Sequence, residues 1–154
     1  MITEAFSVGK PPRFSPPRRM WEDADPVFET QAAQWVGRME DIWDGVFNRY
    51  DKIVKGREFL LQQIVLLEKQ AEMVIDPFGQ SVSPAEQARR ERSKSQLLKQ
   101  KRRMEENLVG LERLFTDWTS ALAHMARTYT QYQERYGGGK RVHFPESITS
   151  HPRF

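Results

Sequence analysis

The chain of 154 residues is 38% hydrophobic and 29% charged, carries a formal net charge of +3 and contains no cysteine. Its length suits one domain, and its low apolar content is more typical of long helices that bury one stripe than of a thick globular core. Disulfides, iron–sulfur clusters and cysteine-ligated zinc are excluded, and no uncharged run approaches the ~20 apolar residues that a membrane span needs.

The range 1–25 is predicted to be an extended Pro/Arg-rich arm. It contains a short repeat, Pro11-Pro12-Arg13 and Pro16-Pro17-Arg18. Proline fixes φ and removes a backbone donor, which favours a polyproline-like strand over a helix. The spacing of these prolines does not match P-x-x-P, so a ligand for an SH3 domain is a weak interpretation.

A first helix is predicted over 26–75. Asp25-Pro26 suits a helix start, and Pro77 with Gly79 predicts its end before a turn at 76–83. Between these limits the apolar residues follow a seven-residue repeat, which is typical of coiled-coil packing. The two rows are Val36, Trp43, Tyr50, Arg57, Ile64 and Ala71, and Met39, Val46, Ile53, Leu60, Leu67 and Val74.

A second helix is predicted over 84–136. Ser83 and Glu86 form a capping box around Pro84, and the glycines from Gly137 onward end the helix. The seven-residue repeat resumes inside it. Its rows are Lys101, Leu108, Phe115, Leu122, Tyr129 and Tyr136, and Leu97, Met104, Leu111, Trp118, Met125 and Tyr132.

The short link predicts that the two helices fold back on each other. The expected fold is therefore all-α, a long antiparallel two-helix coiled-coil-like hairpin over 26–136 with extended N- and C-terminal tails, the last being a Gly-led flexible segment at 137–154. If the turn is symmetric, Trp43 lies level with Phe115 and Trp118, and the polar interruptions Arg57 and Lys101 lie close together. The aromatic residues on these rows are interpreted as core.

One face of the first helix is expected to be uncovered. Its turn-proximal half is strongly apolar, whereas the segment expected to oppose it, 85–100, is mostly polar. So wide an apolar stripe needs more than one neighbouring helix, supplied by a partner or a second copy, unless a bend covers it internally. The predicted apolar contact residues are Phe47, Val54, Leu61, Ile64, Leu67 and Ile75.

A basic segment, 89–103, contains a single acid, Glu91. An acidic protein surface, nucleic acid, anionic lipid or plain solvation could explain it. The charges spread around the helix and no aromatic residue occurs between 84 and 114, which removes base stacking and favours an acidic protein over nucleic acid. The predicted basic contact residues are Arg89, Arg90, Arg92, Lys94, Lys99, Lys101, Arg102 and Arg103.

No catalytic motif is present. The three histidines, His124, His143 and His151, are scattered, and neither a zinc-protease motif, a phosphate loop nor a nucleophile elbow occurs. We therefore expect neither an enzyme nor a bound cofactor or metal.

These patterns predict a non-enzymatic structural or adaptor subunit of a larger protein assembly. The expected partners are other protein subunits with an acidic surface, and a cytoskeletal host such as a microtubule- or cilium-associated assembly fits that chemistry. A cytoplasmic or cytoskeletal location is expected, and a mitochondrial one stays open. The alternative is a nucleic-acid- or ribosome-associated protein that uses 89–103.

Overall fold

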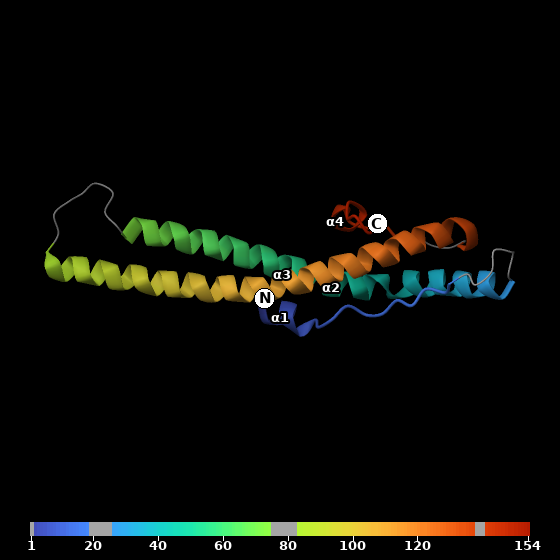
Figure 1. Cartoon of the computed structure of the whole chain (residues 1–154), viewed down its shortest axis with the longest axis horizontal. Coiled ribbons are helices and arrows are strands. Elements are labelled where there is room, and N and C mark those ends of the chain that lie inside the picture. Colours follow the sequence, from blue (N-terminus) through green and yellow to red (C-terminus); the bar gives the residue numbers. More distant parts are fainter. Residues whose placement is uncertain (1, 19–25, 75–82, 138–140) are drawn as a thin grey trace. The chain divides into compact units, whose positions relative to one another are not determined.

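The computed structural model describes residues 2–18, 26–74, 83–137 and 141–154. These residues form four helices and no strand: α1 (Ile2–Ser7), α2 (Pro26–Val74), α3 (Pro84–Tyr136) and α4 (Glu146–Thr149). The long helices α2 and α3 pack against each other, as Figure 1 shows, and the predicted hairpin with tails is confirmed. Ile75 and most of the predicted turn lie outside the described residues.

The chain divides into two compact units. Unit 1 contains α1 together with residues 52–113, and unit 2 contains residues 8–51 together with 114–154. Each unit thus takes one stretch of α2 and one stretch of α3, and each has a core of its own.

Two ion pairs between α2 and α3 show the register of the helices in unit 1. The Arg57 Nε lies 2.6 Å from the Glu112 Oε1, and the Lys101 Nζ lies 2.9 Å from the Glu68 Oε1. The prediction that Arg57 and Lys101 lie close together is therefore wrong, because each has a glutamate of the other helix opposite it.

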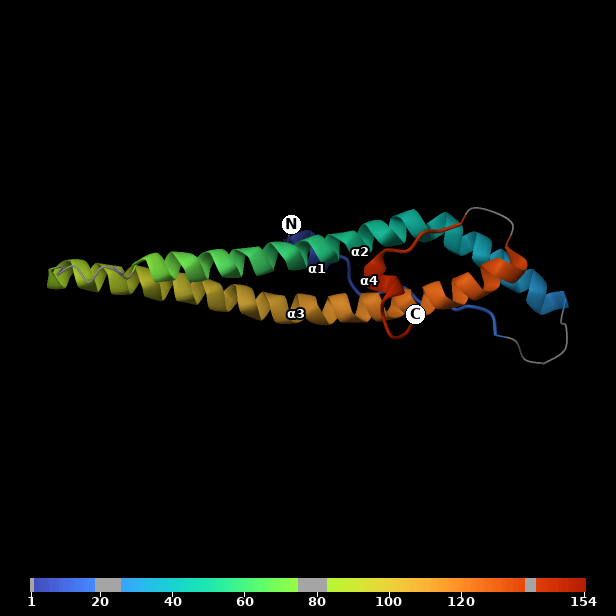
Figure 2. The same ribbon diagram turned by 90° about the horizontal axis from the view of Figure 1, so that it is seen from above.

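The corrected register leaves the start of α3 beyond the end of α2. Continuing the antiparallel spacing brings Val74 level with about residue 95. Figure 2 shows α3 extending past the described end of α2. The reason is apolar matching: Leu97 and Leu111, rather than the polar segment 84–94, come opposite the apolar half of α2.

The start of α3 has the predicted cap. The Glu86 N–H donates to the Ser83 Oγ at 3.2 Å, and the Gln87 N–H donates to the Ser83 carbonyl at 2.9 Å. The Glu86 carboxylate pairs with Arg89 and Arg90 in the following turn. The hydroxyl half of the capping box is therefore present.

The core of unit 1 is aliphatic and follows the predicted rows. Its buried members on these rows are Ile53, Leu60, Ile64, Leu67 and Ala71 of α2 and Leu111 of α3. None of these buried side chains carries a polar atom, so they stabilise the seam through apolar packing.

Helix α1 corrects the prediction that the whole of 1–25 is extended. Residues 2–7 precede the first proline, so nothing prevents a helical turn, and Ala5 is fully buried. Phe6 lies beside Gly110 of α3, where an added Cβ would come within 3.4 Å of the Phe6 ring. Gly9, with φ +73°, then turns the chain in a conformation that suits glycine.

The core of unit 2 is aromatic. Tyr50 stacks on Phe115 with ring centroids 6.1 Å apart, and its hydroxyl lies 3.0 Å from the Thr119 Oγ1. Trp35 packs edge-on against Tyr132 at 5.8 Å. The interpretation of the aromatic residues on the rows as core is confirmed for Trp43, Tyr50, Trp118 and Tyr129, which are buried, and Trp35 beside the rows is buried as well.

The register also corrects the level of Trp43. Tyr50 rather than Trp43 lies beside Phe115, which places the pairing two helical turns from the symmetric expectation. Trp43 contacts Phe47 and the ring of Phe144, whose centroid is 4.8 Å away. The cause is again the offset of α3 relative to α2, since a symmetric turn does not match the apolar rows.

The described C-terminal residues 141–154 pack on unit 2 instead of forming a flexible tail. The Val142 N–H donates to the Tyr129 hydroxyl at 3.2 Å, and the Phe144 ring meets Tyr129 edge-on at 5.6 Å. Ile148 of α4 is fully buried. The apolar residues Val142, Phe144 and Ile148 thus anchor this segment to the helices, which overrides the turn-forming residues between them.

Candidate protein-binding surface

The six apolar residues predicted to meet a partner have different environments. Leu61 and Phe47 are exposed and Val54 is half-buried. Ile64 and Leu67 are buried between α2 and α3, because the register of unit 1 covers them with the chain's own second helix. Ile75 lies outside the described residues.

A set of apolar side chains on α2 of unit 1 is nevertheless exposed. Leu61 is 37% exposed, Val65 48%, Leu66 46% and Met73 81%. We call these four residues the outer face of α2. Leu61 and Val65 lie one turn apart, Leu66 and Met73 lie two turns apart, and all four positions are outside the rows that form the seam.

Val65, Leu66 and Met73 are not among the contact residues predicted from the sequence. A seven-residue repeat assigns them to positions outside the seam, so they carried no signal for packing within the hairpin. Apolar residues at positions outside the seam could have predicted a partner-binding face, because a solvated helix face is usually polar.

Three of the predicted basic residues are tied to carboxylates within unit 1. Arg89 and Arg90 pair with Glu86. Lys101 bonds to Glu68 and lies 3.4 Å from the Glu105 Oε1. The hydrogen bond to Glu68 is the main reason why the pKa of Lys101 is raised. Lys101 thus links the two long helices through Glu68.

The other predicted cations lie on exposed or half-buried positions of α3. Lys94, Lys99 and Arg102 line a hollow of about 360 Å³ together with Glu91, Ser95 and Leu98. The Arg92 Nε donates to the Ala88 carbonyl at 3.4 Å, and Arg103 is exposed. Leu98, itself an exposed apolar residue, thus lies among cations.

The described residues of this surface are exposed apolar and cationic side chains. Among the described residues no group of three or more His, Asp or Glu side chains could hold a metal ion. In the same residues no buried side-chain polar atom lacks a hydrogen-bond partner. Exposed aliphatic side chains near cations are a surface that attracts proteins through desolvation and charge.

No stretch of the described helices has both the length and the apolar character required to cross a membrane. No family model, curated protein or solved structure matches the chain.

Proposed function

We propose that the protein is a non-enzymatic structural or adaptor subunit of a larger assembly, and that unit 1 is the part that binds its partner. The observation that carries this proposal is the outer face of α2, where four apolar side chains are exposed within thirteen consecutive residues, 61–73. Burying one such side chain fully is worth about 1.5–3 kcal/mol, so together they favour association strongly.

The cations of α3 indicate the chemistry of the partner. Lys94, Lys99, Arg102 and Arg103 belong to the same unit as the outer face of α2. Opposite charge accelerates encounter, and apolar contact then slows dissociation. A protein with an acidic surface and an apolar patch fits both, and an acidic cytoskeletal filament such as a microtubule is a partner of this class.

The test compares two charge-matched variants of the full-length chain. Val65→Glu with Leu66→Glu removes apolar surface from α2, whereas Gln62→Glu with Gln70→Glu adds the same charge at exposed polar positions of the same stretch. Tagged proteins are purified from native cells, and stoichiometrically bound proteins are quantified. We expect the first variant to lose them and the second to keep them; equal retention by both would refute the proposal.

Binding of RNA or DNA at physiological salt distinguishes a nucleic-acid partner from an acidic protein. Each phosphate contact steepens the fall of affinity with salt by about 0.9 log units per log unit for duplex DNA. We expect no saturable binding of RNA or DNA at about 150 mM salt, since α3 offers no aromatic side chain between 84 and 114 for base stacking. Tight nucleic-acid binding under these conditions that is lost on changing Lys94, Lys99, Arg102 and Arg103 to Gln would reverse the assignment.

A further inference from the structure

The N-terminal residues 8–18, which we call the arm, are held on unit 2 by side-chain donors of the long helices. The Trp118 Nε1–H donates to the Gly9 carbonyl at 2.8 Å, and the Trp35 Nε1–H donates to the Phe14 carbonyl at 2.7 Å. The Tyr132 hydroxyl donates to the Pro17 carbonyl at 2.6 Å.

A fourth donor lies at the start of the arm. The Arg49 Nη2 donates to the Val8 carbonyl at 3.2 Å, and the same guanidinium lies over the Trp118 ring, 5.0 Å from its centroid. We call Trp35, Arg49, Trp118 and Tyr132 the donor row. All four side chains donate to main-chain carbonyls, which are present in any peptide.

The arm makes little use of hydrogen bonds between backbone groups within the part of the chain that the structure describes. Residues 10–18 form no backbone–backbone hydrogen bond with any described residue. This is the condition of a polyproline strand, which has no internal hydrogen bonds and whose carbonyls are free to accept. The donor row therefore supplies what the strand itself lacks.

The prolines and the arginines of the arm differ in their exposure to solvent. The four prolines at 11, 12, 16 and 17 are half-buried, whereas Arg13 and Arg18 are exposed. The two Pro-Pro-Arg repeats thus place proline against the helices and arginine in solvent. Aromatic side chains that contact prolines and donate to their strand are the mode by which proline-rich ligands are recognised.

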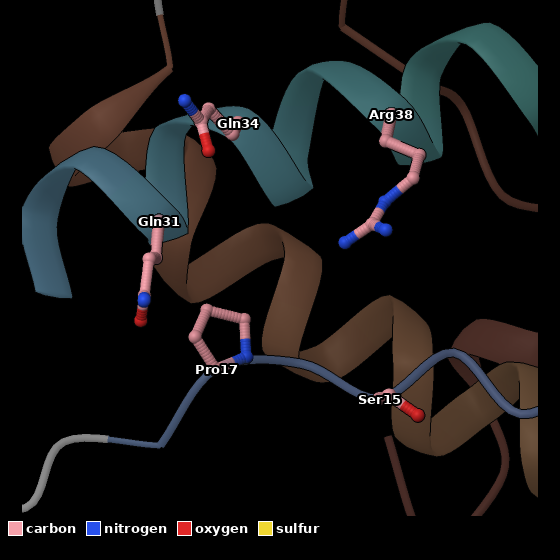
Figure 3. A pocket seen from close by; sticks show the side chains of 5 residues that line it. All are labelled: Ser15, Pro17, Gln31, Gln34 and Arg38. Carbon is pink, nitrogen blue, oxygen red and sulfur yellow. The ribbon is translucent and has the colours of Figure 1, made fainter.

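The packing of the arm against α2 leaves unfilled space and includes a strained residue. A hollow of about 410 Å³ remains between Ser15 and Pro17 of the arm and Gln31, Gln34 and Arg38 of α2, as Figure 3 shows. Ser15 also has φ +45°, a left-handed conformation that residues other than glycine adopt at an energetic cost. A strained ligand beside unfilled space is one that another ligand can replace.

We infer that the donor row is a polyproline-binding site whose resident ligand is the chain's own arm. The ligand class is an extended proline-rich segment of another protein that takes the place of the arm. Recognition through carbonyls does not depend on the ligand being part of this chain. This site lies in unit 2 and is independent of the partner surface proposed in unit 1.

The first experiment weakens the arm and leaves the donor row intact. In the full-length chain the four arm prolines are changed to Gly, and folding is verified by circular dichroism and thermal unfolding. A peptide with the natural sequence of residues 8–18 is then titrated by calorimetry. We expect saturable binding to this variant and at least about ten-fold weaker binding to the natural chain, in which the tethered arm competes.

Donor substitutions in the same background locate the bound peptide. Trp35→Phe and Trp118→Phe each remove one hydrogen bond and should weaken peptide binding about five-fold. Trp43→Phe is the matched control, because Trp43 packs on Phe47 and Phe144 and donates to no arm carbonyl. No saturable binding, or binding that ignores both donor substitutions, would overturn the inference.

A second measurement uses the natural arm, so the inference does not depend on the proline variant folding. The chain has no cysteine, so Lys10→Cys provides a unique site for a spin label. The label should broaden the NMR signals of Trp118, and excess peptide at about millimolar concentration should restore them by displacing the arm. Broadening that persists unchanged at this concentration contradicts exchange.

Discussion

Units 1 and 2 are built from the same two helices but bury different chemistry. Unit 2 has a core of Trp and Tyr whose N–H and O–H groups bond to the arm, to the C-terminal segment and to Thr119 of α3. Unit 1 has an aliphatic seam and leaves aliphatic side chains exposed. Trp and Tyr side chains can hold an extended segment both by directional hydrogen bonds and by burying apolar surface. An aliphatic face binds only through the burial of apolar surface.

The largest expected effect comes from breaking unit 2 at Trp118. Trp118→Ala removes a fully buried indole together with its bond to the Gly9 carbonyl. We expect a loss of about 3–5 kcal/mol in the free energy of unfolding, measured by urea denaturation. Trp118→Phe should lose far less, and equal effects of the two would mean that the indole is not packed as described.

The contrast between buried and exposed leucines in unit 1 has the next largest effect. Leu67→Ala should cost about 2–5 kcal/mol of stability, because Leu67 is buried in the seam. Leu61→Ala, at an exposed position of the same helix, should cost under about 1 kcal/mol. Denaturation of both variants checks the register, and similar losses would contradict it.

Much of this architecture could be predicted from the sequence, and the exceptions have a common cause. The capping box, the glycines after Tyr136 and the repeat rows are local patterns, and they gave the two helices correctly. The register depends on pairs such as Arg57 with Glu112, which lie far apart in sequence. No local pattern determines such a pairing.

The same cause explains the tails and the candidate site. The hydrogen-bond partners of the arm are remote in sequence, as Trp118 is from Gly9. Every residue has a main-chain carbonyl, so the sequence does not indicate which carbonyl accepts a hydrogen bond. The site prediction included Leu61 correctly as an exposed residue, but Ile64 and Leu67 are buried by the true register. Their assignment followed from the symmetric turn, which placed polar residues opposite them.

Alkaline pH should weaken unit 2 through its buried tyrosines. Burial raises the pKa of Tyr129 and of Tyr132 above the ordinary value near 10. A raised folded-state pKa means stability that is full below the unfolded value and is lost as pH rises toward the folded value. The melting temperature should therefore fall above about pH 10, and Tyr132→Phe should reduce that fall. A melting temperature that stays constant through this range would contradict the burial of these hydroxyls.

The smallest effect is expected at the ion pair between Arg57 and Glu112 in unit 1. Both Arg57 and Glu112 are about one-third exposed, so solvent screens their attraction. Glu112→Gln should lower stability by only about 0.2–1 kcal/mol, measured in the same denaturation series, and high salt should shrink the difference. A loss of several kcal/mol would show that the pair is buried and that apolar matching does not dominate the register.

The exposed methionine of unit 1 tests the central claim most directly. Met73 is 81% exposed on the outer face of α2, whereas Met39 and Met125 in unit 2 are buried. Peroxide oxidation followed by mass spectrometry reports the accessibility of each. If unit 1 binds the partner, Met73 should oxidise fast in the isolated chain and slowly in the native assembly, with Met39 and Met125 slow in both. Equal rates for Met73 in the two samples would contradict the assignment of the partner to this face.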